Sequence, residues 1–236
     1  PRIWVGFLGM GLLNNAIPFS LMAWGQLTIE SGLTSILNAT TAIFGVVLAS
    51  LFFADETLSA RKLVGVIIGF LGVAIAIGIE HLLAFDIRSL AQLAIIAGTL
   101  SYAFAGIWAR KRLSGLAPEI AAAGMLTGST LIMLPAAWIL EGPITLALEP
   151  ITWLAIGYYV IIATALAYLL YYRILALAGS GNLMLVTLLV PPIAIVLGAV
   201  VLGEALHPRA YAGFALLALG LIILDGRAVD ALRRAK

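Results

Sequence analysis

Long, nearly continuous apolar runs divide this sequence, and each is close to the length that a helix needs to cross a bilayer. A hydrocarbon core of about 30 Å requires roughly 20 helical residues. Helices satisfy every backbone N–H in lipid, whereas barrel strands alternate apolar and polar residues, which these runs do not. We therefore predict an all-α, polytopic membrane helix bundle with eight spans: Ile3–Gln26, Gly32–Phe53, Lys62–Ile79, Ser89–Ala109, Glu119–Leu140, Ile151–Ala178, Gly181–Leu202 and Arg209–Asp225.

The composition supports a membrane protein and excludes several other classes. The chain is 63% hydrophobic and 10% charged, whereas soluble domains carry about 25% charged residues. Because cysteine is absent, the sequence excludes disulfides and thiolate metal sites. A formal net charge of +2 gives no reason to expect a nucleic-acid partner. Since residue 1 is proline rather than methionine, we expect a fragment that begins without a signal peptide.

The basic residues predict how the helices are oriented. Lys and Arg gather in cytoplasmic loops of membrane proteins. With eight spans, one side collects Arg2, Arg61, Lys62, Arg110, Lys111, Arg112, Arg173, Arg227, Arg233, Arg234 and Lys236, and the other side collects Arg88 and Arg209. We therefore expect the N- and C-termini to be cytoplasmic, with the lipid bilayer as the surrounding partner.

The chain contains an internal repeat. The segment "FADETLSARKLVGVIIGFLG" is matched much later by "LGEALHPRAYAGFALLALG", so that Glu56 corresponds to Glu204 and Gly65 to Gly213. Upstream, Trp4 falls on Trp153 and Ser31-Gly32 on Ser180-Gly181. Because an odd number of spans separates the copies, they cross the membrane in opposite senses, as in the inverted-topology repeats of many secondary transporters.

These motifs resemble the EamA-type transporters of the drug/metabolite transporter (DMT) superfamily. The likeness rests on "NATTAIFGVVLASLFFADE" with its following glycine helix, and on "LVPPIAIVLGAVVLGEAL" in the second copy. One departure is Ala42–Ile43, where the family commonly carries a proline; the second copy keeps Pro191 and Pro192. The resemblance implies a ten-helix, 5 + 5 fold, of which this chain holds 3 + 5 helices and lacks the first two.

The repeat and the resemblance together define the expected domains and function. We expect the last three helices of the first repeat in 1–79, a connecting loop in 80–88, the five-helix second repeat in 89–226 and a basic cytoplasmic tail in 227–236. The resemblance implies a carrier in the plasma membrane, here the bacterial inner membrane, that exports small organic metabolites such as amino acids or amphipathic compounds. A non-transporting integral membrane scaffold or assembly protein is the alternative.

Polar residues inside the predicted spans mark a candidate solute site at the seam of the repeats. They recur at helical spacing, so each group shares one face of its helix. Some of these hydroxyls can instead bond their own backbone, and the amides can join helices. The residues expected to contact the solute are Asn15, Pro18, Asn38, Thr41, Ser101, Tyr102, Thr164, Tyr168 and Thr187.

Other residues are expected to be structural. The glycine stripes around Gly65–Gly72 and Gly213–Gly220 predict close packing between these two helices or with a second copy in a homodimer. Glu56 and Glu204 are expected to cap or lock a neighbouring helix. No charge stands near the middle of a span, and His81 and His207 lie in loops. We therefore expect no catalytic residue, no metal site and no cofactor, and we do not expect an enzyme.

Overall fold

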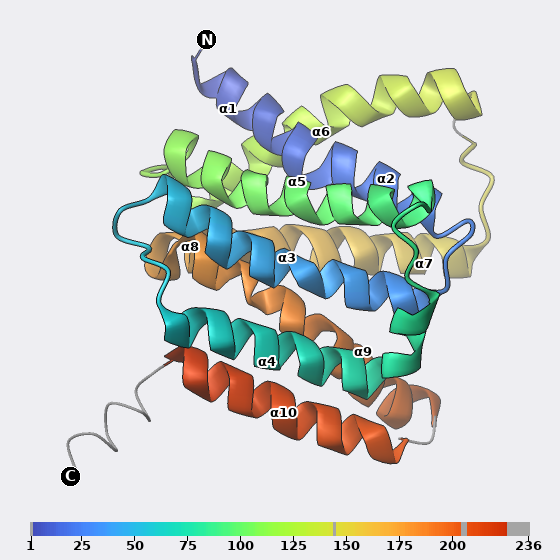
Figure 1. Ribbon diagram of the computed structural model, residues 1–236. Coiled ribbons are helices and arrows are strands. Elements are labelled where there is room, and N and C mark those ends of the chain that lie inside the picture. The colour runs from blue at the N-terminus through green and yellow to red at the C-terminus, as the bar shows by residue number, and fades with distance from the viewer. Residues whose placement is uncertain (1, 144, 204–206, 226–236) are drawn as a thin grey trace.

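The computed structural model describes residues 2–143, 145–203 and 207–225, which form helices joined by loops (Figure 1). No strand occurs in these ranges, which confirms the predicted all-helical class. Two of the short elements, η1 and η3, are π-helical, and η2 is a 3₁₀ helix. The elements are α1 (Arg2–Gly11), η1 (Leu12–Ala16), α2 (Ile17–Gly25), α3 (Ser31–Phe52), α4 (Ala60–Ile77), η2 (Ile79–Ala84), α5 (Leu90–Arg112), α6 (Pro118–Glu141), α7 (Pro150–Tyr158), η3 (Tyr159–Leu166), α8 (Ala167–Met184), α9 (Val186–Leu202) and α10 (Pro208–Asp225).

Within the described ranges, seven helical stretches are long and apolar enough to cross a membrane. The longest runs from Pro150 to Met184 over 35 residues, and at about 1.5 Å per residue an unbroken helix of that length would far exceed the bilayer core. Gly179 interrupts it with φ 82° and ψ 174°, so residues 180–184 form a separate helical turn ahead of α9. This turn and α9 occupy the stretch predicted as the seventh span, and α9 alone is a shorter apolar helix.

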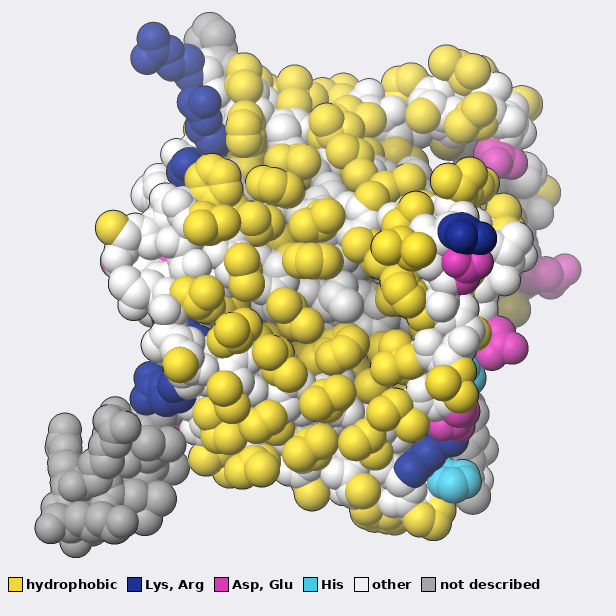
Figure 2. Space-filling model, viewed as in Figure 1, with side chains coloured by type: hydrophobic (Ala, Val, Ile, Leu, Met, Phe, Trp, Pro, Cys, Tyr) yellow, Lys and Arg dark blue, Asp and Glu magenta, His cyan; other side chains and the backbone are white. Residues whose placement is uncertain are grey.

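The face of the molecule shown in Figure 2 carries an apolar band with charged side chains at its two edges. Large side chains such as Val5, Leu131 and Leu154 are exposed within the described chain. So extensive an apolar surface is suited to lipid rather than to water. We call one edge the arginine-rich end; it is formed by the start of α1, the α3–α4 loop and the end of α5, and it carries Arg2, Arg61, Lys62, Arg110, Lys111 and Arg112.

Helices α4 and α10 pack with their backbones almost in contact, as the glycine stripes predict. A Cβ atom added at Gly72 would lie 2.5 Å from the Leu217 nitrogen and 2.7 Å from the Gly213 oxygen. One added at Gly65 would lie 2.9 Å from the Gly220 oxygen. Residue numbers rise along α4 as they fall along α10, so the two helices run antiparallel. The close packing predicted from the stripes therefore joins these two helices.

The main core cluster lies where α1, α5, α6 and α8 meet. Met10 and Met125 are fully buried there, and Ala105 and Met184 complete the contact between α5 and α8. Small residues at these contacts let the helices approach closely. The same packing places η1, η3 and α8 around a common interior.

Replacing Gly72 with alanine should destabilise the protein by about 1–3 kcal/mol, because the new methyl group meets backbone atoms that have no room to move. Thermal unfolding of the detergent-solubilised protein measures the effect. Gly157→Ala in α7 is the matched control, since nothing lies within 4 Å of its added Cβ atom. Equal midpoints for Gly72→Ala and Gly157→Ala would contradict the close α4–α10 contact.

Candidate solute-binding site

A cavity of about 450 Å³ lies between the helices. It is bounded by η1, α3, α5, η3, α8 and α9, so both copies of the sequence repeat contribute to it. No lining residue carries a formal charge, and the lining combines amides, hydroxyls, phenols and apolar groups. The lining residues are Asn14, Asn38, Thr41, Tyr102, Ala163, Ala167, Tyr168, Leu170, Tyr171, Ile174, Leu183, Met184, Val186 and Thr187.

Three lining residues present buried polar atoms that have no partner in the described structure. These atoms are Asn38 Oδ1, Thr41 Oγ1 and the Tyr171 hydroxyl. A buried polar atom without a hydrogen bond costs about 1–3 kcal/mol, so most such atoms are paired. All three residues line one cavity, so a solute with hydrogen-bonding groups bound there would lie beside them.

Pro18 explains the local geometry of the first helix. A proline has no N–H, so it leaves one carbonyl of the preceding turn unpaired. The Ile17 N–H donates to the Leu12 carbonyl, five residues earlier, as in a π-helix. In the same pattern the Leu13 carbonyl would accept from residue 18, but Pro18 has no N–H to donate. The Ser101 hydroxyl of α5 donates to the Leu13 oxygen at 2.6 Å instead. Ser101 of α5 therefore stabilises the π segment and does not line the cavity.

Asn15 joins three helices next to the cavity. Its Nδ2 donates to the Ser129 hydroxyl at 2.6 Å, and its Oδ1 accepts from the Tyr168 hydroxyl at 2.5 Å. Ser129 in turn donates to the Met125 carbonyl within α6. The neighbouring Asn14 faces the cavity. Asn15 thus fixes the orientation of Tyr168, which does line the cavity.

The structure brings part of the predicted site together. The predicted residues that line the cavity are Asn38, Thr41, Tyr102, Tyr168 and Thr187, and those outside its lining are Asn15, Pro18, Ser101 and Thr164. For Asn15 and Thr164, the π segments in which they lie explain the displacement, because the wider π turn rotates side chains away from their α-helical positions. In both copies the residue one position earlier, Asn14 or its repeat-mate Ala163, faces the cavity.

The predicted set leaves out several lining residues. Tyr171 is one of them, although the sequence places it with Thr164 and Tyr168 among the polar residues of the same span. Leu183 and Met184 are apolar residues in an apolar helix, so no pattern distinguishes them from ordinary core. Among the described residues, no group of three His, Cys, Asp or Glu side chains is placed to hold a metal ion.

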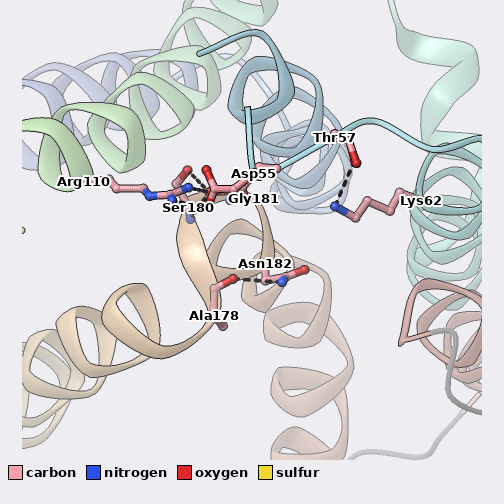
Figure 3. Close-up of polar contacts among 9 residues, drawn as sticks. Asp55, Thr57, Lys62, Arg110, Ala178, Ser180, Gly181 and Asn182 are labelled. Atoms are coloured by element: carbon pink, nitrogen blue, oxygen red, sulfur yellow. Dashed lines mark hydrogen bonds and ion pairs between the residues drawn. The ribbon is translucent and has the colours of Figure 1, made fainter. Parts of the chain in front are cut away.

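A cluster of charged side chains lies at the arginine-rich end (Figure 3). Arg110 at the end of α5 pairs with Asp55 and Glu56 of the α3–α4 loop. Its hydrogen bond to Asp55 lowers the pKa of that exposed carboxyl below its ordinary value. Glu56 also accepts bonds from the Ser180 and Gly181 N–H groups, at 2.9 and 2.7 Å. Glu56 therefore caps a helical turn, as predicted, and its repeat-mate Glu204 lies outside the described residues.

Comparisons with known proteins give one family and one fold. The model of a family described as "EamA-like transporter family" matches residues 1–78 and 89–224. A solved structure titled "Crystal structure of protein" is similar with a TM-score of 0.77 and 17% sequence identity, over 94% of this chain and 77% of that chain. At this identity the likeness concerns the fold alone. A comparison with curated proteins finds no match.

Ser101→Ala should destabilise the protein by about 1–3 kcal/mol, because it leaves the Leu13 carbonyl buried without a donor. Ser50→Ala is the matched control, since the Ser50 hydroxyl bonds only the Val47 carbonyl of its own helix. Thermal unfolding in detergent compares the two variants. Equal stability would show that Ser101 does not support the π segment.

Proposed function

The chain belongs to the EamA-like transporter family, and from that premise we propose that it is a secondary transporter that exports small organic metabolites by alternating access. The family consists of DMT-type membrane transporters rather than enzymes. The transported solute occupies the central cavity. Amino acids and amphipathic compounds are the proposed cargo.

The observation that carries this proposal is the uncharged central cavity with its unpartnered polar atoms. Asn38, Thr41 and Tyr171 offer hydrogen-bonding groups at one site, while Tyr102 and Tyr168 add aromatic surface. A non-transporting scaffold gains nothing from leaving such atoms unpaired, because each one costs stability. A solute with an apolar body and a few polar groups fits this lining. For a zwitterion, helix ends and backbone dipoles would have to hold the charged groups.

The proposed mechanism rests on an inverted repeat. The antiparallel packing of α4 against α10 supports it, because these helices are the last of each copy and must cross the membrane in opposite senses. The π segments η1 and η3 give further support, since they fall at matched positions of the two copies. In this mechanism one copy rocks against the other and exposes the cavity to each side in turn.

The proposed orientation places the arginine-rich end in the cytoplasm of the bacterial inner membrane, with both termini on that side. The support is the charge asymmetry of the loops, since short cytoplasmic loops retain Lys and Arg. Arg61, Lys62 and Lys111 lie at this end, while Arg88 and Arg209 lie at the other. The partners of the protein are then the solute and the bilayer, and a homodimer remains a proposal that its oligomeric state in detergent would test.

Thr41→Val tests the assignment of the cavity to solute. The change removes an unpaired hydroxyl at nearly constant volume, so folding stability should stay equal or rise while export falls about tenfold. Mass spectrometry of the medium compares amino acids and aromatic metabolites released by cells that overexpress the complete protein and by deleted cells. Asn38→Leu should reduce export similarly.

Thr130→Val is the matched control, because Thr130 is exposed and its hydroxyl bonds the Leu126 carbonyl of its own helix. Its export should equal that of the unchanged protein. Full export by both Thr41→Val and Asn38→Leu would show that the transported solute does not bind in this cavity. No difference in any metabolite between overexpressing and deleted cells would instead favour the scaffold alternative.

A further inference from the structure

We propose that Glu56 is the lock of a gate at the arginine-rich end: the path from the central cavity to that end opens when its carboxylate leaves the backbone of Ser180 and Gly181. This inference rests on the proposed transport function. It adds the residues that close the path and a route beyond the cavity.

The Glu56 carboxylate is held on both oxygens. Its Oε1 accepts from the Ser180 N–H and hydroxyl, each at 2.9 Å, and its Oε2 accepts from the Gly181 N–H at 2.7 Å. Arg110 supplies the counter-charge. The Glu56 side chain is only 11% exposed. A carboxylate held by backbone N–H groups at the start of a helical turn forms charge-assisted bonds, which are stronger than neutral ones.

Gly179 makes this contact available. With φ 82° it interrupts α8, so the N–H groups of Ser180 and Gly181 begin a new turn and have no partner inside the helix. Glu56 comes from the α3–α4 loop, a different part of the bundle. The bond therefore ties the broken end of α8 to α3, and its release frees residues 180–184 to move as a unit.

Met184 closes the cavity one turn beyond the lock. It lines the cavity and is 4% exposed. A Cβ atom added at Gly45 of α3 would lie 2.4 Å from the Met184 Cβ, and one at Gly106 of α5 would lie 3.2 Å from its Cε. Met184 is thus held against two glycines on the neighbouring helices α3 and α5. Because it belongs to the turn that Glu56 caps, the lock and this plug move together.

A second hollow lies between the end of α5 and α8. It has a volume of about 210 Å³ and is lined by Arg110, Ser114 and Tyr172 at the arginine-rich end. Tyr171 lines the central cavity, and its ring lies 5.2 Å from that of Tyr172. Both hydroxyls are buried without a partner. The two adjacent tyrosines therefore line one hollow each, and their unpaired hydroxyls would serve a polar solute passing between the hollows.

Cysteine labelling tests the gate without any transported solute. The chain has no cysteine, so Thr41→Cys, at a fully buried position in the cavity, is a single reporter. A membrane-impermeant maleimide is added to inside-out and to right-side-out membrane vesicles. Glu56→Ala should raise the labelling rate from the arginine-rich face about tenfold, because the closed state loses its charge-assisted bonds.

A second variant tests the same barrier at another residue. Gly45→Ala forces Met184 out of its position and should raise labelling from the same face, whether or not Glu56→Ala folds. Asp55→Ala is the matched control for Glu56, because Asp55 also pairs with Arg110 but is 68% exposed and does not contact Ser180. Gly157→Ala is the control for the glycine change, since nothing surrounds its added Cβ atom. Both controls should label within about twofold of the background, well below the shift expected for a displaced gate.

The outcomes separate the gate from the proposed function. Faster labelling of both gate variants with slow controls supports the gate, even if export from cells is absent. Unchanged labelling in a folded Glu56→Ala and in Gly45→Ala overturns it, even if export is intact. Equally fast labelling in the two controls also overturns it, because general loosening of the bundle would then explain the result.

Discussion

Every backbone N–H and C=O inside a bilayer must find a partner within the protein, and this constraint governs the irregular parts of the fold. Regular helices meet it by themselves. At two places where the described chain departs from them, a side chain from elsewhere in the bundle supplies the missing partner. The Ser101 hydroxyl pairs the carbonyl that Pro18 leaves free, and the Glu56 carboxylate pairs the N–H groups that Gly179 exposes. These compensating contacts tie together the helices that surround the cavity.

The contrast between regular helices and these irregular segments also explains how much of the molecule could be predicted from the sequence. Hydrophobic runs with glycine, proline and charged boundaries predict the helices well, because length and composition alone decide what crosses a membrane. The close contact of α4 with α10 also follows from the sequence, since glycines such as Gly72 and Gly213 repeat on one helical face. Both features depend on short stretches of sequence: the hydrophobicity of each run, and glycines that recur about every helical turn.

The side-chain register around the cavity could not be predicted in the same way. An α-helical period assigns Asn15 to the cavity, whereas the π segment turns Asn14 inward and directs Asn15 to Ser129 and Tyr168. No sequence pattern signals a π segment reliably, since its stability comes from long-range partners such as Ser101. The roles of Gly179 and Met184 depend likewise on helices distant in the sequence.

The proposed mechanism requires that two similar helical triplets cross the membrane in opposite senses around the shared cavity. Single cysteines at Thr57, in the α3–α4 loop, and at His207, before α10, test it most directly, because these loops follow corresponding helices of the two copies. An impermeant maleimide should label Thr57→Cys only in inside-out vesicles and His207→Cys only in right-side-out vesicles. Labelling of both positions from the same face would contradict the account.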